Sequence, residues 1–295
     1  MKSILGGLFV GIIFLFSTSN SCFSQEIDSK KLQRLVLKDG SELIGTIEKE
    51  DSTMIFFKMM GNISLTIPLE QVQKREKLLG EIIGGKYYPF DPNNSRLLLA
   101  PTAHPLDFGE GYFSVYQIFF PFITVGFTKY FAVGGGFSLF PAVENQVFYL
   151  APKIIPIQTE KFDLAGGLVY TSITDINGGG SIVYGVGTYG TQKTAVTLGL
   201  GWLGWEFLGL ELIKEQQIIM IGLETQFSQK NIKLISENWL IPNSGVNLIS
   251  FGVRFFGKRL AADFGLIHPL GAKIKGFPFF PWIGFAYNFG THERK

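Results

Sequence analysis

Residues Gln216–Leu266 read QQIIMIGLETQFSQKNIKLISENWLIPNSGVNLISFGVRFFGKRLAADFGL. Four apolar segments are separated in this stretch by the polar sequences SQKN, PNSG and GKR. Each segment has roughly the 9–11 residues that a β-strand needs to cross a bilayer, and each separator contains residues that favour tight turns. The stretch therefore predicts antiparallel strands long enough to span a membrane.

Apolar residues alternate with small or charged residues inside these segments. In the third segment, Phe251, Val253 and Phe255 share one face, whereas Gly252 and Arg254 share the other. Successive side chains of a strand point to opposite sides of the sheet, so each segment has one apolar face. This face would point inward in a soluble sandwich and toward lipid in a membrane barrel, and the alternation fits both.

The amino terminus predicts export. Residues 1–24 begin with a lysine after Met1, continue through an apolar core at Ile4–Phe16 and end in a polar stretch, as in a cleaved signal peptide. We expect cleavage before Gln25. Lipid modification of Cys22, the single cysteine, is the alternative, although Ser19 stands where a lipobox normally has leucine.

The density of charged residues divides the remaining chain. Residues 26–91 contain 21 Asp, Glu, Lys and Arg residues, whereas the much longer stretch 92–295 contains 28. We therefore expect the following parts: a small β-rich periplasmic module at 25–80, a linker or plug at 81–111, a membrane barrel at 112–290 and a polar tail at 291–295. Because 26 basic residues balance 24 acidic ones, the composition does not favour nucleic-acid binding.

The predicted periplasmic module contains four or five short strand-like segments, which favour a small bent sheet. Its Lys38-Asp39-Gly40 turn, followed by Gly45 and by Asp51, resembles the first motif of Sm-like folds. That resemblance implies RNA binding, but the second Sm motif is missing and an exported chain meets no RNA. The simpler interpretation is turn chemistry, and we expect residues 25–80 to act as a spacer or to dock a periplasmic protein.

From Tyr112 onward, twelve segments have the length and composition of strands. They are Phe113–Phe120, Ile123–Tyr130, Ala132–Phe140, Val147–Ile155, Phe162–Thr171, Ser181–Tyr189, Thr194–Trp202, Ile218–Ser228, Ile232–Leu240, Val246–Phe256, Leu260–Ile267 and Trp282–Phe289. An even strand number is typical of a bacterial up-and-down barrel whose two ends lie in the periplasm.

The connections between these segments alternate in length. Five are short and contain lysine: Lys129–Phe131, Thr159–Lys161, Thr191–Lys193, Gln229–Asn231 and Gly257–Arg259. The opposite set contains the longest ones: Ser172–Gly180, Leu203–Gln217 and His268–Phe280. Outer-membrane barrels have short periplasmic turns and longer outer loops, whereas a sandwich has no reason for this alternation.

The aromatic residues support the same interpretation. We expect Trp202, Trp205, Trp239 and Trp282 to lie at strand ends on the long-loop side, as membrane-interface aromatics. The last strand resembles the C-terminal signal that barrel insertion machinery recognises, except that a polar tail follows it. The chain from about residue 95 onward thus resembles Gram-negative outer-membrane β-barrels of unassigned function, which implies insertion into outer-membrane lipid.

Seven charged residues fall on the inward face of the predicted barrel: Lys153, Asp163, Glu224, Lys233, Glu237, Arg254 and Asp263. Glu224, Glu237, Arg254 and Asp263 come from four consecutive strands and are expected to form one lumenal patch. Such residues either line a selective pore or fill a closed lumen with ion pairs. Because most other inward residues are small, we expect space for water, a ligand or a plug, and Asp91–Gly111 is the candidate plug.

Three classes of function follow. The first is passage or binding of a small solute or lipid through the lumen. The second is a non-transporting envelope component that docks proteins through its periplasmic module and outer loops. The third is a lipid-modifying enzyme, for which His268 at the outer rim is the candidate base. We predict no enzymatic activity, no catalytic residue, no metal site and no cofactor.

Overall fold

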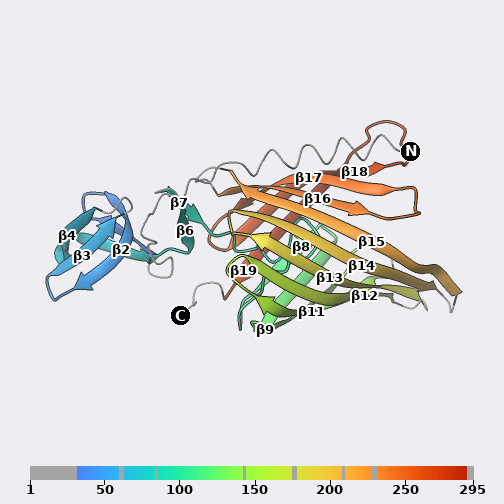
Figure 1. Cartoon of the computed structure of the whole chain (residues 1–295), viewed down its shortest axis with the longest axis horizontal. Helices are drawn as coiled ribbons and strands as arrows, with labels where there is room; N and C mark the ends of the chain where they lie inside the picture. The colour runs from blue at the N-terminus through green and yellow to red at the C-terminus, as the bar shows by residue number, and fades with distance from the viewer. Residues whose placement is uncertain are drawn as a thin grey trace. The chain divides into compact units, whose positions relative to one another are not determined.

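The computed structural model describes residues 32–59, 63–83, 86–141, 144–174, 178–207, 210–227 and 231–290 (Figure 1). The predicted signal peptide 1–24, with Cys22, and the tail 291–295 lie outside the described residues. The chain divides into two compact units, Met1–Arg75 and Glu76–Lys295. Among the described residues, no helix is long and apolar enough to span a membrane.

A five-stranded antiparallel sheet forms the first unit, in the order β4-β3-β2-β1-β5. Its strands are β1 Leu32–Leu37, β2 Glu42–Glu50, β3 Met54–Met59, β4 Ser64–Pro68 and β5 Val72–Lys77, with a 3₁₀ turn at Leu69–Gln71. Leu35, Ile55, Phe57 and Ile67 form its buried core. The prediction of a small β-sheet is confirmed.

Two aspartates of the Sm-like motif act within turns of this sheet. Asp39 accepts a hydrogen bond from the backbone N–H of Ser41 at 2.8 Å. Asp51 accepts bonds from the backbone N–H groups of Thr53 and Met54 at 2.9 and 2.8 Å. These contacts explain the motif through local turn chemistry.

Twelve strands of the second unit close into an antiparallel barrel (Figure 1). They are β8 Gly111–Tyr116, β9 Phe120–Thr128, β10 Phe131–Phe137, β11 Val147–Gln158, β12 Phe162–Ile173, β13 Gly178–Gly190, β14 Thr194–Phe207, β15 Leu210–Gln226, β16 Ile232–Leu240, β17 Asn247–Phe256, β18 Leu260–Leu270 and β19 Phe280–Phe289. The last strand pairs with β8 and thereby closes the ring. The predicted twelve-stranded up-and-down barrel is confirmed.

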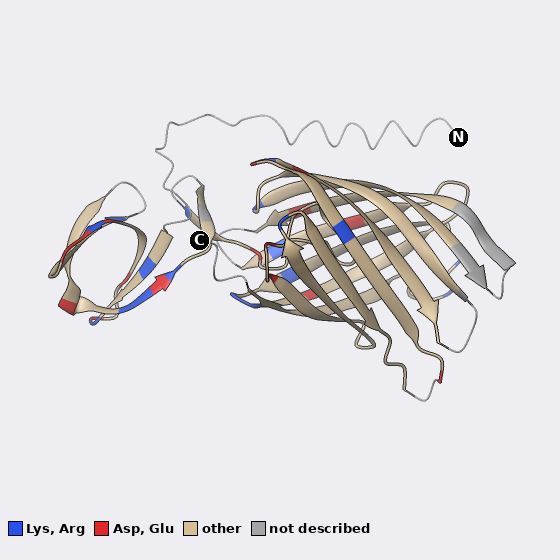
Figure 2. Cartoon of the chain, turned by 90° about the horizontal axis from the view of Figure 1, so that it is seen from below, with Lys and Arg blue, Asp and Glu red and all other residues tan. Residues whose placement is uncertain are grey.

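The outer face of the barrel is apolar. Phe255 is 47% exposed, its ring packs against the exposed Phe264 of the next strand, and Phe264 packs in turn against the exposed Phe285. Few charged residues interrupt the barrel strands (Figure 2). A closed sheet leaves no unpaired backbone edge, so exposed apolar side chains of this kind face lipid rather than a second sheet.

Two strand boundaries differ from the predicted ones. The first hairpin turns at Gln117 and Ile118, whose φ angles are +48° and +69°, instead of continuing to Phe120. The predicted long loop Leu203–Gln217 belongs largely to strands, because β14 and β15 pair as far as Phe207 and Leu210. Apolar and polar residues mix in that stretch, so its alternation gave no signal for a strand.

The stretch predicted as a linker or plug contains two distinct structures. Strands β6 Gly80–Ile83 and β7 Lys86–Pro89 form a small hairpin. Residues 91–106, which we call the plug, then enter the barrel before β8 begins. Within the plug, Arg96 and Pro101 form an isolated bridge, and the backbone N–H of Thr102 donates to Ser95 O at 3.1 Å.

Candidate functional site in the barrel lumen

Glycines of the barrel wall make room for the plug. A Cβ atom at Gly222 would lie 2.2 Å from Leu97 Cδ1, and one at Gly252 would lie 3.0 Å from Leu98 Cδ2. Leu97 and Leu98 are both buried in a core cluster that includes Met220 of the wall. The small inward residues of the sequence therefore receive the apolar tip of the plug.

Register places three charged residues of the wall at one level. Lys233 of β16 lies opposite Arg254 of β17, and Arg254 lies opposite Asp263 of β18. Arg254 Nε donates to Asp263 Oδ1 at 2.6 Å. Lys233 Nζ lies 3.4 Å from Glu224 Oε2 and 3.2 Å from Asp91 Oδ2 of the plug. The row is thus an ion-paired network that includes the plug.

Arg254 is the main link between wall and plug. Its Nη1 donates to Asp91 Oδ2 at 2.9 Å and to the carbonyl of Asn93 at 2.7 Å. Its Nη2 donates to the carbonyl of Leu97 at 2.5 Å. Arg96 of the plug makes a further ion pair with the wall, because its Nη1 lies 2.6 Å from Asp263 Oδ2. Since all these charges are buried, removal of one partner leaves another buried charge uncompensated.

This network stabilises the ionised form of the Asp91 carboxyl group. Burial opposes its ionised form, but the positive charges of Arg254 and Lys233 outweigh burial and keep the pKa of Asp91 well below its ordinary value of 3.8. The backbone N–H of Asn93 adds a hydrogen bond of 2.9 Å. Asp91 therefore stays ionised at neutral and mildly acidic pH.

A second set of polar contacts holds the other side of the plug. Lys153 Nζ donates to the carbonyls of Thr102 and His104 at 2.9 and 2.8 Å. His104 Nδ1 lies 2.9 Å from Asp163 Oδ2. The backbone N–H of Ala103 donates to Thr188 Oγ1 at 2.8 Å. Strands β11, β12 and β13 thus hold residues 102–104 against the wall.

Glu237 holds the tip of the plug. Its Oε2 accepts the backbone N–H groups of Leu99 and Ala100 at 2.9 and 3.0 Å, and its Oε1 accepts Trp239 Nε1 at 2.8 Å. Its cross-strand neighbours are Gly222 and Ser250, at a different level from Arg254. The predicted single patch of four charged residues is therefore wrong: the register divides it into an ion-paired row and a separate carboxylate.

All seven predicted lumenal residues are buried inside the barrel. Most of their partners come from the plug, which alternation along the wall does not predict. Arg96 had a sequence signal, since it is a charged residue directly before the apolar run LLLAP. The side chains of Asn93 and Asn288 form a hydrogen bond of 2.9 Å although they are 195 positions apart in the chain. No sequence signal predicts this contact.

A cavity of about 440 Å³ lies between the plug and the outer part of the barrel. Small-molecule sites typically enclose about 300–1,000 Å³. Its aromatic lining residues are Tyr112, Tyr116, Phe120, Phe122, Tyr149, Tyr184, Trp239 and Trp282. Among the described residues that line it, Arg96 and Lys153 are the only charged ones.

The four tryptophans do not share a membrane interface as predicted. Trp202 is 46% exposed on the outer face, as expected. Trp282 is only 8% exposed and packs against Tyr116 with the ring centroids 5.9 Å apart. Trp239 also lines the cavity, because it has the same strand parity as the inward Glu237. The side chain of Trp205 lies outside the described residues.

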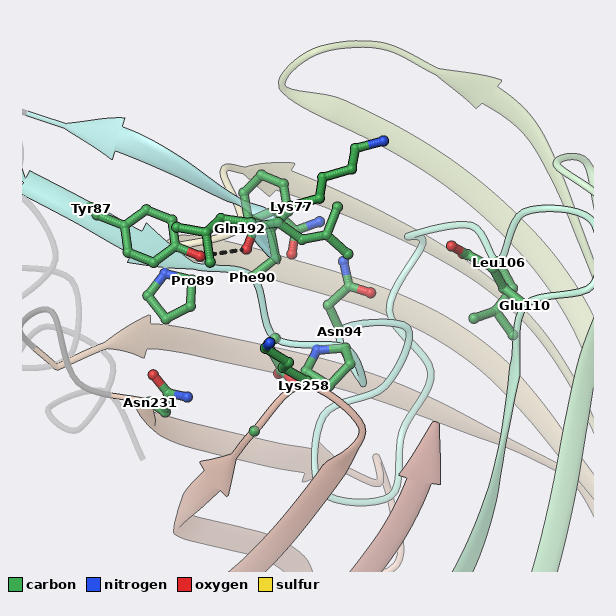
Figure 3. A pocket seen from close by; sticks show the side chains of 15 residues that line it. Lys77, Tyr87, Pro89, Phe90, Asn94, Leu106, Glu110, Gln192, Asn231 and Lys258 are labelled. Atoms are coloured by element: carbon green, nitrogen blue, oxygen red, sulfur yellow. Dashed lines mark hydrogen bonds between the residues drawn. The ribbon is translucent and has the colours of Figure 1, made fainter. Parts of the chain in front are cut away.

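A smaller cavity of about 110 Å³ lies at the short-turn end (Figure 3). Phe90 and Pro89 line it beside Lys258, and Tyr87 donates its hydroxyl to Leu79 O at 3.0 Å. Lys193 Nζ lies 4.3 Å from the ring centroid of the neighbouring Tyr88. The β6–β7 hairpin thus packs near the barrel turns, and the space left is below the usual size of a ligand site.

His268 belongs to an outer loop contact. Its Nδ1 lies 2.8 Å from the carbonyl oxygen of Pro278, and its ring centroid lies 5.3 Å from that of Phe279. In the part of the chain that the structure describes, no three His, Cys, Asp or Glu side chains are grouped to hold a metal ion.

Comparison with solved structures finds similar barrels. The KdgM porin has a TM-score of 0.45 and 9% identity, over 61% of this chain and 98% of the porin. A loop-deletion mutant of OmpT, an outer membrane protein of Vibrio cholerae, has a TM-score of 0.35 and 11% identity, over 88% and 96%. OccK7 of Pseudomonas aeruginosa has a TM-score of 0.32 and 9% identity, over 87% and 68%.

This chain forms a closed, twelve-stranded antiparallel β-barrel with an apolar outer face. The likeness lies in architecture and not in sequence. No family model matches the chain, and no curated protein matches it.

Proposed function

We propose that this barrel binds a small solute in its lumenal cavity and passes it only when the plug leaves the lumen. The observation that carries the proposal is the division of the lumen. Residues 91–106 close one part through buried ion pairs and apolar packing, whereas the other part retains a cavity of about 440 Å³.

The nature of the plug contacts supports a gate rather than a permanent core. Leu97 and Leu98 contribute apolar packing, but Arg254, Lys153 and Glu237 hold the plug through polar contacts to backbone atoms. When the plug moves, hydrogen bonds to water or to a passing solute can replace these polar contacts. Apolar packing that is lost from a core is not replaced in this way.

The proposal includes the cellular setting. The chain is exported with removal of residues 1–24, is inserted into outer-membrane lipid by the barrel insertion machinery, and acts by binding and passage rather than by catalysis. The apolar outer face and the paired terminal strands support this placement. The sheet at 32–77 is the part available to dock a periplasmic protein, which would favour the second class of function.

Conductance in planar bilayers tests the gate. We expect refolded wild-type protein to be closed and the double variant Leu97→Ser, Leu98→Ser to conduct, because two buried leucines then become polar. Leu99→Ser is the matched control, since Leu99 is 54% exposed in the cavity and should leave the barrel closed.

Two results would contradict the gate. Equal steady current through wild type and the double variant would mean that the plug does not control passage. Silence of a correctly folded double variant would exclude release of residues 91–106 as the opening step. In the second case, a pull-down with residues 25–80 would test the docking function.

A further inference from the structure

Arg96 presents an unpaired edge inside the barrel. Its side chain is only 2% exposed, and its Nη1 is engaged with Asp263 and with the carbonyls of Leu97 and Leu98. Within the described part of the chain, its Nε and Nη2 atoms have no hydrogen-bond partner. These two nitrogens form one edge of the guanidinium, with the fork geometry that holds a carboxylate through two parallel bonds.

The surroundings of this edge favour an anion. Arg96 lines the cavity, and Lys153 is the only other charged residue among its described lining residues. The carboxylate that pairs with Arg96, Asp263, is not a lining residue. Trp282 adds a second buried donor, because its Nε1 also lacks a partner in the described chain.

The remaining walls favour an apolar or aromatic body. Phe120, Phe122, Trp239 and Trp282 line the cavity together with small aliphatic residues. Arg96 Cζ lies 5.1 Å from the ring centroid of Tyr116, so the guanidinium already lies beside an aromatic ring, and the buried Nε–Nη2 edge has no hydrogen-bond partner among the described residues. If each non-hydrogen atom takes the roughly 30 Å³ of a water in the liquid, about fifteen atoms fit into this volume.

We propose that the lumenal cavity binds an amphipathic monocarboxylate, with its carboxylate on the Nε–Nη2 edge of Arg96 and its apolar body among the aromatic walls. The inference rests on the proposed function in naming the solute class, but it concerns the binding step alone. The carboxylate satisfies two buried donors that otherwise cost free energy, and the body displaces water from aromatic surface.

Calorimetric titration of the full-length protein tests this assignment. The probes are 4-phenylbutyrate and its neutral amide, which differ in charge and have the same number of non-hydrogen atoms. We expect the acid to bind roughly ten to a hundred times more tightly, as hydrogen bonds to a charged group imply. Arg96→Gln should abolish the preference, whereas Arg259→Gln, at an exposed turn arginine bonded to Tyr287, should retain it.

The wild-type comparison decides the matter even if Arg96→Gln fails to fold. Equal affinity for acid and amide, or no binding of either, would overturn the assignment and mean that water satisfies the Arg96 edge. A tenfold preference for the acid that Arg259→Gln preserves would support it. The conductance experiment is independent, since a closed or open plug is measured there without any ligand.

Discussion

Replacement of Arg254 by glutamine should release the plug. The side chain of Arg254 makes hydrogen bonds to Asp91, Asn93 and Leu97 of the plug and two bonds to Asp263. The variant leaves Asp91 with Lys233 alone and removes the fork that joins wall and plug. Loss of one partner from a buried ion pair typically costs about 3–5 kcal/mol.

That free energy sets the size of the expected effect. If the loss falls on the docked plug, the ratio of docked to released plug falls by about 100- to 5,000-fold, at about 1.4 kcal/mol per factor of ten. The barrel strands keep their backbone pairing in both states, because the plug does not contribute to the ladder. The variant should therefore remain a folded barrel with a more accessible lumen.

Cysteine modification measures this ratio directly. Ala103 is a plug residue that is fully buried in the docked state. A cysteine at this position therefore reports release of the plug through its reaction with a membrane-impermeant maleimide. Cys22, the only native cysteine, is replaced by serine in this background. When opening and closing are faster than modification, the labelling rate follows the population of the open state.

We expect labelling to accelerate at least a hundredfold in Arg254→Gln and to remain unchanged in Arg259→Gln. Labelling that rises less than tenfold in a variant with intact barrel pairing would refute the reasoning, because the apolar seat of Leu97 and Leu98 would then hold the plug without the ion pairs.

Three further predictions test other parts of the structure. Gly222→Leu should displace Leu97 and open a conductance in planar bilayers, because a Cβ there already lies 2.2 Å from Leu97 Cδ1. Leu200→Arg, on the exposed outer face, should destabilise the barrel in urea unfolding from lipid vesicles by about 2–4 kcal/mol if it lies near the bilayer midplane. Because the pKa of Asp91 is lowered, its contribution to plug docking is fully present above 3.8 and is lost only as the pH falls through the lower folded value. The labelling rate of Ala103→Cys, divided at each pH by the rate of the unfolded protein to cancel thiol ionisation, should therefore stay constant from about pH 8 to 5. A rise of this ratio within that range would contradict the assigned ion pairs.

Local pattern was sufficient to predict the barrel wall. The alternation of Phe251, Gly252, Val253 and Arg254 specifies which side chains point outward, because the two faces of a strand are separated by one residue. The same rule placed all seven charged candidates inside. The same alternation puts Trp239 and Trp282 on the lumenal face, whereas their residue type alone predicts a membrane interface.

The sequence by itself determined an all-β barrel with an apolar outer face and a charged lumen, since these features repeat over a few residues. Only the tertiary structure decided what the lumenal charges do. Arg254 and Asp91 are 163 positions apart and meet because the plug turns back into the closed barrel. Contacts between distant segments depend on closure of the barrel and on packing of the plug, and local periodicity carries no information about either. The cavity at Arg96 exists only when the barrel is closed and the plug is packed inside it.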